Sequence, residues 1–228
     1  MERLYRIEPH LHTAESSKCG FISGADFVEQ YHALGYDGVV ITDHLSESFV
    51  SSLNCKHNWD ACIDLFLGGY NRARRQGEKI GLHVMLGAEI RFNEPNDSDY
   101  LLYGIDEAWL RRNPYPYRLS PAAFFERFGD EILIIQAHPF RGKNEDVFVD
   151  CIHGIELYNS SPRHNNNLEK ALELSKSHPE FYLFAGSDAH REGDASGAWM
   201  LFPELVTSSR ELREAVLRKD YILRCRGV

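Results

Sequence analysis

The sequence predicts an α/β fold built on a parallel sheet. Short apolar runs alternate with amphipathic segments along the chain, and this β-then-α order is typical of parallel strands joined by crossover helices. Segment 132–135 (Ile-Leu-Ile-Ile) is apolar on both faces, as expected for a strand that helices cover. About seven such units could close as a barrel, and an open doubly wound sheet would give much the same pattern. The residues alone leave these two arrangements open.

Each expected element has a local signal. The expected strands are short apolar runs at 4–8, 38–42, 84–90, 100–105, 132–137, 155–158 and 182–185. The expected helices lie at 25–34, 59–76, 121–128, 168–177 and 209–218. Ser120 followed by Pro121 marks a helix start, and Gly129 and Gly35 mark helix ends.

Two long polar segments, 45–58 and 93–99, interrupt the alternation. Each follows an expected strand, so each would lie on the face where α/β folds place their active sites. Both are predicted to be loops, either functional or merely solvated.

The composition is that of a soluble globular protein. A chain of 228 residues with 43% hydrophobic and 26% charged residues suits one domain over 1–228 with its own core. The formal net charge of −9 does not favour long nucleic acid as a partner, although bound divalent ions would reverse the sign locally. No apolar run approaches the ~20 residues of a membrane span, and no secretory signal opens the chain. We therefore expect no membrane partner and a cytoplasmic location.

The five cysteines are odd in number and contain no CxxC pair. A disulfide framework and a cysteine-type structural zinc site are therefore not expected, and a reducing cytosol is the simpler interpretation. Each cysteine is expected to be a small buried or half-buried hydrophobe.

Histidines and carboxylates recur at the ends of the expected strands. In chain order they are His10, His12, Asp43, His44, Glu89, His138, Asp188 and His190. In a parallel β/α fold these strand ends converge on one rim, so the side chains would meet in one pocket. His10 and His12 are two residues apart and would point to the same side of a strand, which lets both bind one metal ion. Imidazole and carboxylate ligands without thiolate suit Zn²⁺, Mn²⁺, Fe²⁺ or Mg²⁺.

Further roles follow from the chemistry of the side chains. Asp43 could orient or polarise a ligand while His44 binds the metal. The two oxygens of the Glu89 carboxylate could bridge two ions. Arg141 and Arg163 are the best candidates for clamping a phosphate, because guanidinium binds phosphate in a bidentate fashion. Each arginine could equally be a surface residue.

Five segments together resemble the successive motifs of the PHP (polymerase and histidinol phosphatase) superfamily. They are HLHT (10–13), ITDH (41–44), GAE (87–89), AHPF (137–140) and GSDAH (186–190). The resemblance extends from the first residues to about residue 197. It implies a distorted (β/α)7 TIM-like barrel of the PHP type with a trinuclear metal centre at the C-terminal rim. The family includes stand-alone histidinol phosphatases, small nucleotide phosphatases and a domain of bacterial replicative polymerases.

The resemblance also implies how the ligands divide among the ions. The first ion would take His10, His12, Glu89 and Asp188; the second, Glu89 and His138; the third, His44 and His190.

Two positions depart from the family pattern. The first lies shortly after the HxH pair, where Glu15 is the candidate replacement. The second opens the strand after the Glu89 loop, where Asp99 could substitute. These changes make the predicted site richer in carboxylates, which favours harder ions such as Mn²⁺ or Mg²⁺.

The implied activity is hydrolysis of a small-molecule phosphate ester (a sugar, amino-alcohol or nucleotide phosphate). Two or three divalent ions (Zn, Mn, Fe or Mg) would activate a bridging hydroxide, and Arg141 or Arg163 would neutralise the phosphoryl oxygens. The leaving group would be stabilised by a third metal ion or protonated by His190 or Asp43.

Three alternatives compete with this activity. One is a nuclease or phosphodiesterase acting on short oligonucleotides. Another is an amidohydrolase-type C–N hydrolase; such enzymes share the HxH start but often carry a bridging lysine where Glu89 stands. The third is a non-catalytic metal-binding or interaction domain with a degenerate site.

Overall fold

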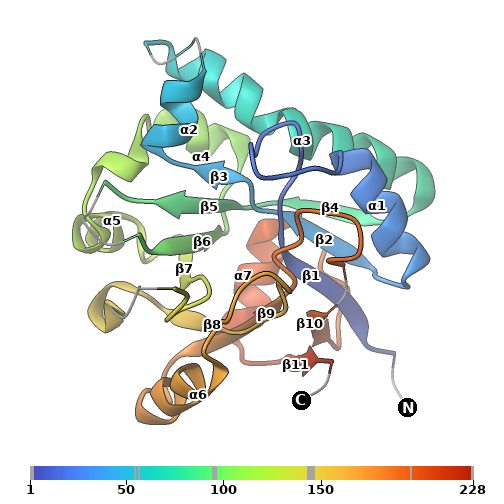
Figure 1. Cartoon of the computed structure of the whole chain (residues 1–228), viewed down its shortest axis with the longest axis vertical. Helices are drawn as coiled ribbons and strands as arrows, with labels where there is room; N and C mark the ends of the chain where they lie inside the picture. Colours follow the sequence, from blue (N-terminus) through green and yellow to red (C-terminus); the bar gives the residue numbers. More distant parts are fainter. Residues whose placement is uncertain are drawn as a thin grey trace.

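The computed structural model describes residues 3–53, 55, 57–93, 97–142, 147–195 and 197–226. In this part of the chain the strands form two sheets, with helices packed around them (Figure 1). The first sheet has the order β11–β10–β1–β2–β4, with bounds Ile222–Cys225, Ala198–Phe202, Tyr5–Leu11, Gly38–Ile41 and His83–Leu86. The second has the order β3–β5–β6–β7–β8–β9, with bounds His44–Leu45, Ala88–Arg91, Asp99–Tyr103, Leu133–Gln136, Gly154–Asn159 and Tyr182–Gly186.

The helices of the described residues are α1 (Gly24–Ala33), α2 (Glu47–Ser52), α3 (Trp59–Ile80), α4 (Glu107–Arg112), α5 (Pro121–Phe128), α6 (Leu168–Ser177) and α7 (Ser209–Leu217), with short 3-10 turns at Pro116–Arg118 and Val149–Cys151. Five of them lie close to the predicted positions, whereas α2 and α4 were not predicted. Ser120 caps α5 by accepting a hydrogen bond from the backbone N–H of Ala123, as its sequence predicts. Figure 1 shows α1 beside α3 along the flank of the first sheet. None of the helices formed by the described residues is both long and apolar enough to span a membrane.

Two segments of chain run from the first sheet directly into the second. Only Thr42 and Asp43 separate β2 from β3, and only Gly87 separates β4 from β5. Gly87 is required at this bend because a Cβ there would lie 2.9 Å from side-chain carbons of Val40 and Thr42. A parallel bridge between Leu11 and Ala189 also links the two sheets. The α/β class is confirmed; closure into a barrel stays a prediction, because the hydrogen-bonded ladders form two sheets.

The expectation of a parallel sheet is wrong for four of the strand pairs among the described residues. β6 pairs antiparallel with both β5 and β7, and β10 pairs antiparallel with β1 and β11. Only residues 92–98 separate β5 from β6, which is too short for the crossover that a parallel pair needs. The prediction of a loop throughout 45–58 is also wrong, since α2 lies within it, capped at its start by the Ser46 side chain.

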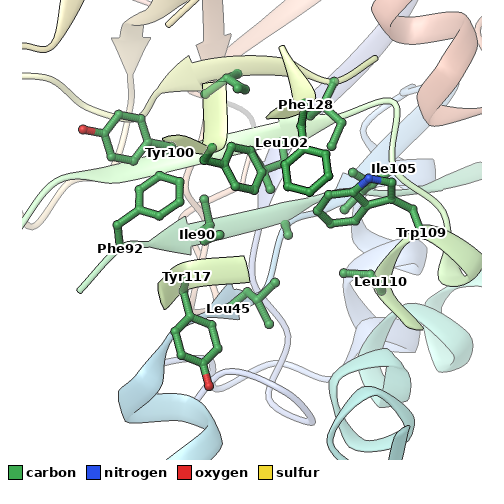
Figure 2. Close-up of a cluster of buried hydrophobic side chains, with 14 of the residues drawn as sticks. Leu45, Ile90, Phe92, Tyr100, Leu102, Ile105, Trp109, Leu110, Tyr117 and Phe128 are labelled. Atoms are coloured by element: carbon green, nitrogen blue, oxygen red, sulfur yellow. The ribbon is translucent and has the colours of Figure 1, made fainter. Parts of the chain in front are cut away.

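The largest apolar cluster decides which way the second sheet presents its functional residues. Figure 2 shows Ile90 of β5 packed with Tyr100 and Leu102 of β6 and with aromatic rings that include Trp109. Side chains alternate between the two faces of a strand, so burying Ile90 on this face turns Glu89 to the opposite one. Burial of the apolar face therefore orients the candidate metal ligand.

Candidate metal centre

Three buried side chains from two strands converge on one point. Within the described residues, one nitrogen each of His10 and His12 and one oxygen of Glu89 lie within 4.8 Å of one another. His10 Nε2 is 3.0 Å from His12 Nε2 and 3.5 Å from Glu89 Oε1, and His12 Nε2 is 3.4 Å from Glu89 Oε2. These separations suit neighbouring ligands of one ion, whose bonds to nitrogen and oxygen are about 2.0–2.2 Å long.

Asp188 and His138 join this group from two other strand ends. Asp188 Oδ1 is 3.5 Å from His10 Nε2 and 3.3 Å from His12 Nε2, and His138 Nε2 is 3.0 Å from Glu89 Oε1. Both residues have a positive backbone φ, 31° for His138 and 52° for Asp188, which residues other than glycine rarely adopt. Such backbone strain clusters at functional sites, where the surrounding structure holds it.

The two oxygens of Glu89 face different partners. Oε1 faces His138, whereas Oε2 is 2.7 Å from Nδ1 of His44. In the described part of the chain His44 also belongs to two further groups of converging ligand atoms, one with His12 and His190 and one with Glu89 and Asp99. The structure thus brings the seven ligands implied by the resemblance into one continuous cluster, with Glu89 placed to bridge.

An unsatisfied buried atom shows that this cluster fits divalent ions. Glu89 is 1% exposed, yet its Oε2 accepts no hydrogen bond of acceptable geometry from any described residue, although His44 Nδ1 lies 2.7 Å away. The Nδ1 atom of fully buried His12 is likewise without a described partner. A buried carboxylate oxygen that accepts no hydrogen bond is costly. A bound cation would satisfy it, and the donor set of imidazole and carboxylate suits Zn²⁺, Mn²⁺ or Fe²⁺.

The charged groups of the cluster shift the pKa values of His10 and Glu89 in directions that favour positive charge beside Glu89. Burial lowers the pKa of His10, but the carboxylates of Glu156, Asp188 and Glu89 outweigh burial and hold that pKa well above its ordinary value. Burial raises the pKa of Glu89, but His44 and His10 hold it well below its usual range. Both directions favour the charged forms of these groups. Bound divalent ions would supply the balancing charge in place of protons on the imidazoles, which bind metal only when neutral.

Glu156 supports the centre, and our sequence analysis missed it. Its Oε1 is 2.9 Å from His10 Nδ1, and its Oε2 accepts hydrogen bonds from the His138 backbone N–H (3.0 Å) and from Asn159 (2.8 Å). A carboxylate that accepts from Nδ1–H of a histidine leaves Nε2 as the free metal-binding atom. The available signal was a glutamate inside the otherwise apolar strand segment 154–158 (Gly-Ile-Glu-Leu-Tyr).

We expect Glu156→Gln to weaken metal binding by roughly 10–100-fold, as loss of an outer-shell partner of a ligand typically does. The amide would no longer favour the tautomer of His10 that carries its proton on Nδ1. Titration of the chelated protein with Zn²⁺ or Mn²⁺ would measure this, with Glu204→Gln on the exposed surface as the control. Equal affinity in both variants would contradict the supporting role of Glu156.

Asp43 lies in a network of hydroxyl and backbone donors. It accepts hydrogen bonds from the Thr13 backbone N–H (2.7 Å), the Thr13 hydroxyl (2.6 Å) and the Ser17 hydroxyl (2.7 Å). Burial raises its pKa to about 6, although these hydrogen bonds oppose the rise. The contacts tie the segment after the HxH pair to the end of β2; the proposed proton transfer by Asp43 stays a prediction.

The two predicted replacement ligands lie in different surroundings. Glu15 accepts a hydrogen bond from the Gly24 N–H (3.0 Å) and pairs with Arg72 (3.1 Å), and it belongs to none of the ligand groups found among the described residues. Asp99 does belong to such a group, yet both of its oxygens also pair with Arg91, at 2.7 and 2.6 Å. Geometry therefore favours Asp99 over Glu15 as a ligand.

The two candidate phosphate clamps are both engaged with aspartates. Arg141 Nη1 is 2.8 Å from Asp188 Oδ2, at the edge of the cluster. Arg163 pairs with Asp194 (2.6 Å), whose other oxygen accepts from the backbone N–H of His190 (2.9 Å). Arg141 thus contacts a candidate ligand directly, whereas Arg163 is linked to the backbone of His190 only through Asp194.

A pocket of about 280 Å³ opens beside the cluster. Its lining includes His44 and Asp99 from the cluster, with Lys18 and Arg91 as cationic groups and Phe49 as an apolar wall. Cys19 also lines it. Desolvation raises the pKa of the Cys19 thiol, but hydrogen bonds to His190 and His44 outweigh desolvation and lower it to about 6.

Two solved structures of proteins described as phosphoesterases share this architecture. A two-domain protein from Bacteroides vulgatus ATCC 8482, described as containing a predicted PHP-like metal-dependent phosphoesterase, matches with a TM-score of 0.66 and 17% identity. The match covers 98% of this chain and 65% of that protein, so this chain spans less than two thirds of its length. A protein from Bifidobacterium adolescentis ATCC 15703, also assigned by prediction as a metal-dependent phosphoesterase, matches with a TM-score of 0.57 and 17% identity over 96% of this chain and 98% of that one. The chain has a PHP-like fold.

A protein described as an amidohydrolase is also similar in structure to this chain. This structure, from Chromobacterium violaceum with bound sulfate and no metal, matches with a TM-score of 0.58 and 14% identity over 95% of this chain and 97% of that one. No family model matches the sequence, and no curated protein matches it. Likeness at these identities shows the fold, so the activity must be argued from the site.

Proposed function

We propose that this protein is a metal-dependent hydrolase that cleaves the phosphate ester of a small molecule. One observation carries the proposal: the buried Glu89 carboxylate turns one oxygen to His138 and the other to His44 and His12. A bridging carboxylate between two groups of imidazoles is the arrangement that a two-metal hydrolytic site needs.

Divalent ions bound by this cluster would supply water activation near neutral pH and Lewis-acid stabilisation of the phosphoryl oxygens. The protein's own contribution is to hold the ligands in place. Glu156 directs Nε2 of His10 into the cluster by accepting at Nδ1, and Arg141 holds Asp188 through its Oδ2 atom. Because these groups are already positioned and buried, little reorganisation is needed when charge develops during the reaction.

The pocket beside the cluster supports a small anionic substrate. Lys18 and Arg91 line it, and although Arg91 pairs with Asp99, Lys18 brings a cationic group to the pocket of a protein whose net charge is −9. A guanidinium and an ammonium can both bind a phosphate group. A cavity of about 280 Å³ admits a small molecule more readily than a folded nucleic acid.

Metal analysis combined with two model substrates tests the proposal. We expect two or three divalent ions per chain, and hydrolysis of p-nitrophenyl phosphate that is lost on chelation and restored by Mn²⁺, Zn²⁺ or Fe²⁺. A preference for bis-p-nitrophenyl phosphate would instead indicate a diesterase, and short oligonucleotides would then be assayed. Turnover that survives complete chelation would contradict the proposal.

The amidohydrolase alternative rests on the match to the protein from Chromobacterium violaceum. A panel of N-acyl amino acid p-nitroanilides, assayed with the same metals, would test it. The alternative would replace the phosphoesterase if anilides were cleaved and both phosphate substrates were not. A carboxylate rather than a lysine at the bridging position, Glu89, favours the phosphoesterase.

A further inference from the structure

Arg91 lies on the face of β5 that carries Glu89. The two residues are two positions apart, and side chains alternate along a strand, so both point away from the apolar cluster that contains Ile90. Asp99 of β6 stands directly opposite Arg91 in the antiparallel ladder. Its Oδ1 accepts from Arg91 Nε (2.7 Å) and its Oδ2 accepts from Arg91 Nη2 (2.6 Å). The strand pairing therefore fixes the guanidinium beside the candidate metal centre.

One edge of this guanidinium is still open. A guanidinium has five N–H donors in a planar fork. Asp99 takes one from Nε and one from Nη2, and Nη1 has no acceptor among the described residues. The edge formed by Nη1 and Nη2 therefore remains available for a second bidentate partner. The Arg91 side chain is 44% exposed and lines the pocket of about 280 Å³, so a small molecule in the pocket can reach it.

Arg141 is used differently, because the protein itself binds each of its three guanidinium nitrogens. Nε donates to Asn166 (2.8 Å), Nη2 donates to Asn159 (2.8 Å), and Nη1 is 2.8 Å from Asp188 Oδ2. Arg141 thus holds protein groups around a candidate ligand. Arg91 is the arginine with donors left for a substrate.

The second cation of the pocket comes from the loop after the HxH pair. Exposed Lys18 lines the pocket, and its neighbour Ser17 fixes the loop by donating to Asp43 (2.7 Å). The Gly20 N–H donates to the Ser17 carbonyl (3.0 Å) and closes the turn. Cys19 in this turn is exposed, so the expectation that each cysteine is a buried or half-buried hydrophobe is wrong for Cys19.

The charges of the pocket indicate which group binds at Arg91. Among the described residues that line it, the lysine, arginine and acidic side chains are Lys18, Arg91 and Asp99, two positive and one negative. An oxygen of Asp99 also lies within 4.8 Å of ligand atoms of His44 and Glu89, so the Asp99 carboxylate stands next to both the candidate metal centre and the guanidinium. A phosphate at the centre would be repelled by Asp99 on its way to Arg91. The single net positive charge at Arg91 and Lys18 matches a carboxylate better than a second, dianionic phosphate.

We propose that Arg91 is a specificity-determining residue that binds a carboxylate of the substrate, so that the substrate is a small phosphate ester whose alcohol part carries a carboxylate. The proposal rests on the proposed function, because the ester phosphate is assigned to the metal centre. The open Nη1–Nη2 edge binds the carboxylate in a bidentate fashion, and Lys18 adds positive charge beside it. Asp99 is then a positioning residue that holds the guanidinium.

Two non-hydrolysable phosphonates measure this preference without turnover. 4-Phosphonobutanoate and butylphosphonate have the same number of carbon atoms and differ in a carboxylate against a methyl group. Calorimetric titration of the Mn²⁺-loaded protein should give a Kd about 10–100-fold lower for 4-phosphonobutanoate, as expected for a charge-assisted hydrogen-bonded pair. Equal Kd values for the two compounds would overturn the proposal.

The Arg91→Lys variant separates recognition from a structural role. Lysine keeps a cation beside Asp99 but lacks the planar second edge, so the Kd for 4-phosphonobutanoate should rise about tenfold while that for butylphosphonate and the ion content stay unchanged. Arg218→Lys, on the exposed surface, is the matched control and should alter neither Kd. Weakening of both phosphonates alike by Arg91→Lys would show a structural role and overturn the proposal.

Two phosphate esters extend the test to turnover. The kcat/KM should be about 10–100-fold higher for 3-phosphoglycerate than for glycerol 3-phosphate, and Arg91→Lys should raise KM for 3-phosphoglycerate with little change in kcat. Equal kcat/KM for both esters, or a higher value for 1,3-propanediol bisphosphate than for 3-phosphoglycerate, would overturn the carboxylate assignment and leave the proposed function standing. If the metal-loaded protein hydrolysed none of these esters and no p-nitrophenyl phosphate, the proposed function would be overturned as well.

Discussion

Replacing Glu89 by glutamine is expected to lower kcat/KM for the preferred phosphate ester by on the order of 10³-fold, at least as much as removing one preorganised oxyanion donor. The amide keeps the shape of the side chain but removes the charge that faces His138 and His44. It also places an NH2 group against imidazole nitrogens that must present lone pairs to a cation. Metal content should therefore fall together with activity, because the bridge between the ligand groups is lost.

The matched control for Glu89→Gln is Glu126→Gln, on the exposed surface of α5. Steady-state kinetics and elemental analysis of both variants, each reconstituted with the same metal, would give the comparison. If Glu89→Gln kept its full complement of ions and its activity, this result would contradict both the bridging role of Glu89 and the proposed mechanism.

Gly69→Ala is expected to destabilise the protein and to disturb the candidate metal centre. This effect is expected although α3, the helix that contains Gly69, carries none of the candidate ligands. A Cβ on Gly69 of α3 would lie 1.8 Å from Thr13 Oγ1 and 3.0 Å from Asp43 Oδ2. Thr13 follows the candidate ligand His12 and donates to Asp43, so relieving the clash must move the segment that carries the HxH pair. Overpacking of this kind costs about 1–3 kcal/mol or more of unfolding free energy.

The neighbouring glycine is the control, because the same substitution there should have the opposite sign. A Cβ on Gly68 would make only ordinary contacts of 3.8 Å with Glu15 and Ser16. Gly68→Ala should therefore stabilise the helix by about 0.5–1 kcal/mol, since alanine loses less backbone entropy on folding. Thermal unfolding of the two chelated variants would reveal the difference, and metal titration should show weakened binding only for Gly69→Ala. Similar melting temperatures for both would refute the close approach of α3 to Thr13.

The sequence alone predicted most of the elements and the residues that carry the candidate chemistry. Apolar periodicity and capping residues are local signals, which is why α5 and α6 match their predicted bounds at 121–128 and 168–177. The ligand positions were predictable for a related reason: β/α folds gather the ends of their strands on one rim, and histidines and carboxylates mark those ends.

Strand direction and the supporting contacts were not predictable in this way. The antiparallel pairing of β6 with β7, a strand about 30 residues further along, is not encoded in any pattern within β6 itself. Glu156 supports His10 across 146 positions of sequence, and Arg72 engages Glu15 from α3. No local spacing encodes contacts of that range.

The sequence by itself determined the α/β class. It also determined which histidines and carboxylates are available to hold metal and their positions at the ends of strands. Only the tertiary structure decided which of them meet. It turned Glu89 away from the apolar cluster and into the candidate metal centre, and it engaged Glu15 and Asp43 in holding loops. The physical reason is that residue type and periodicity are properties of the local chain, whereas the direction of a side chain and its partners depend on which faces become buried when distant segments pack together.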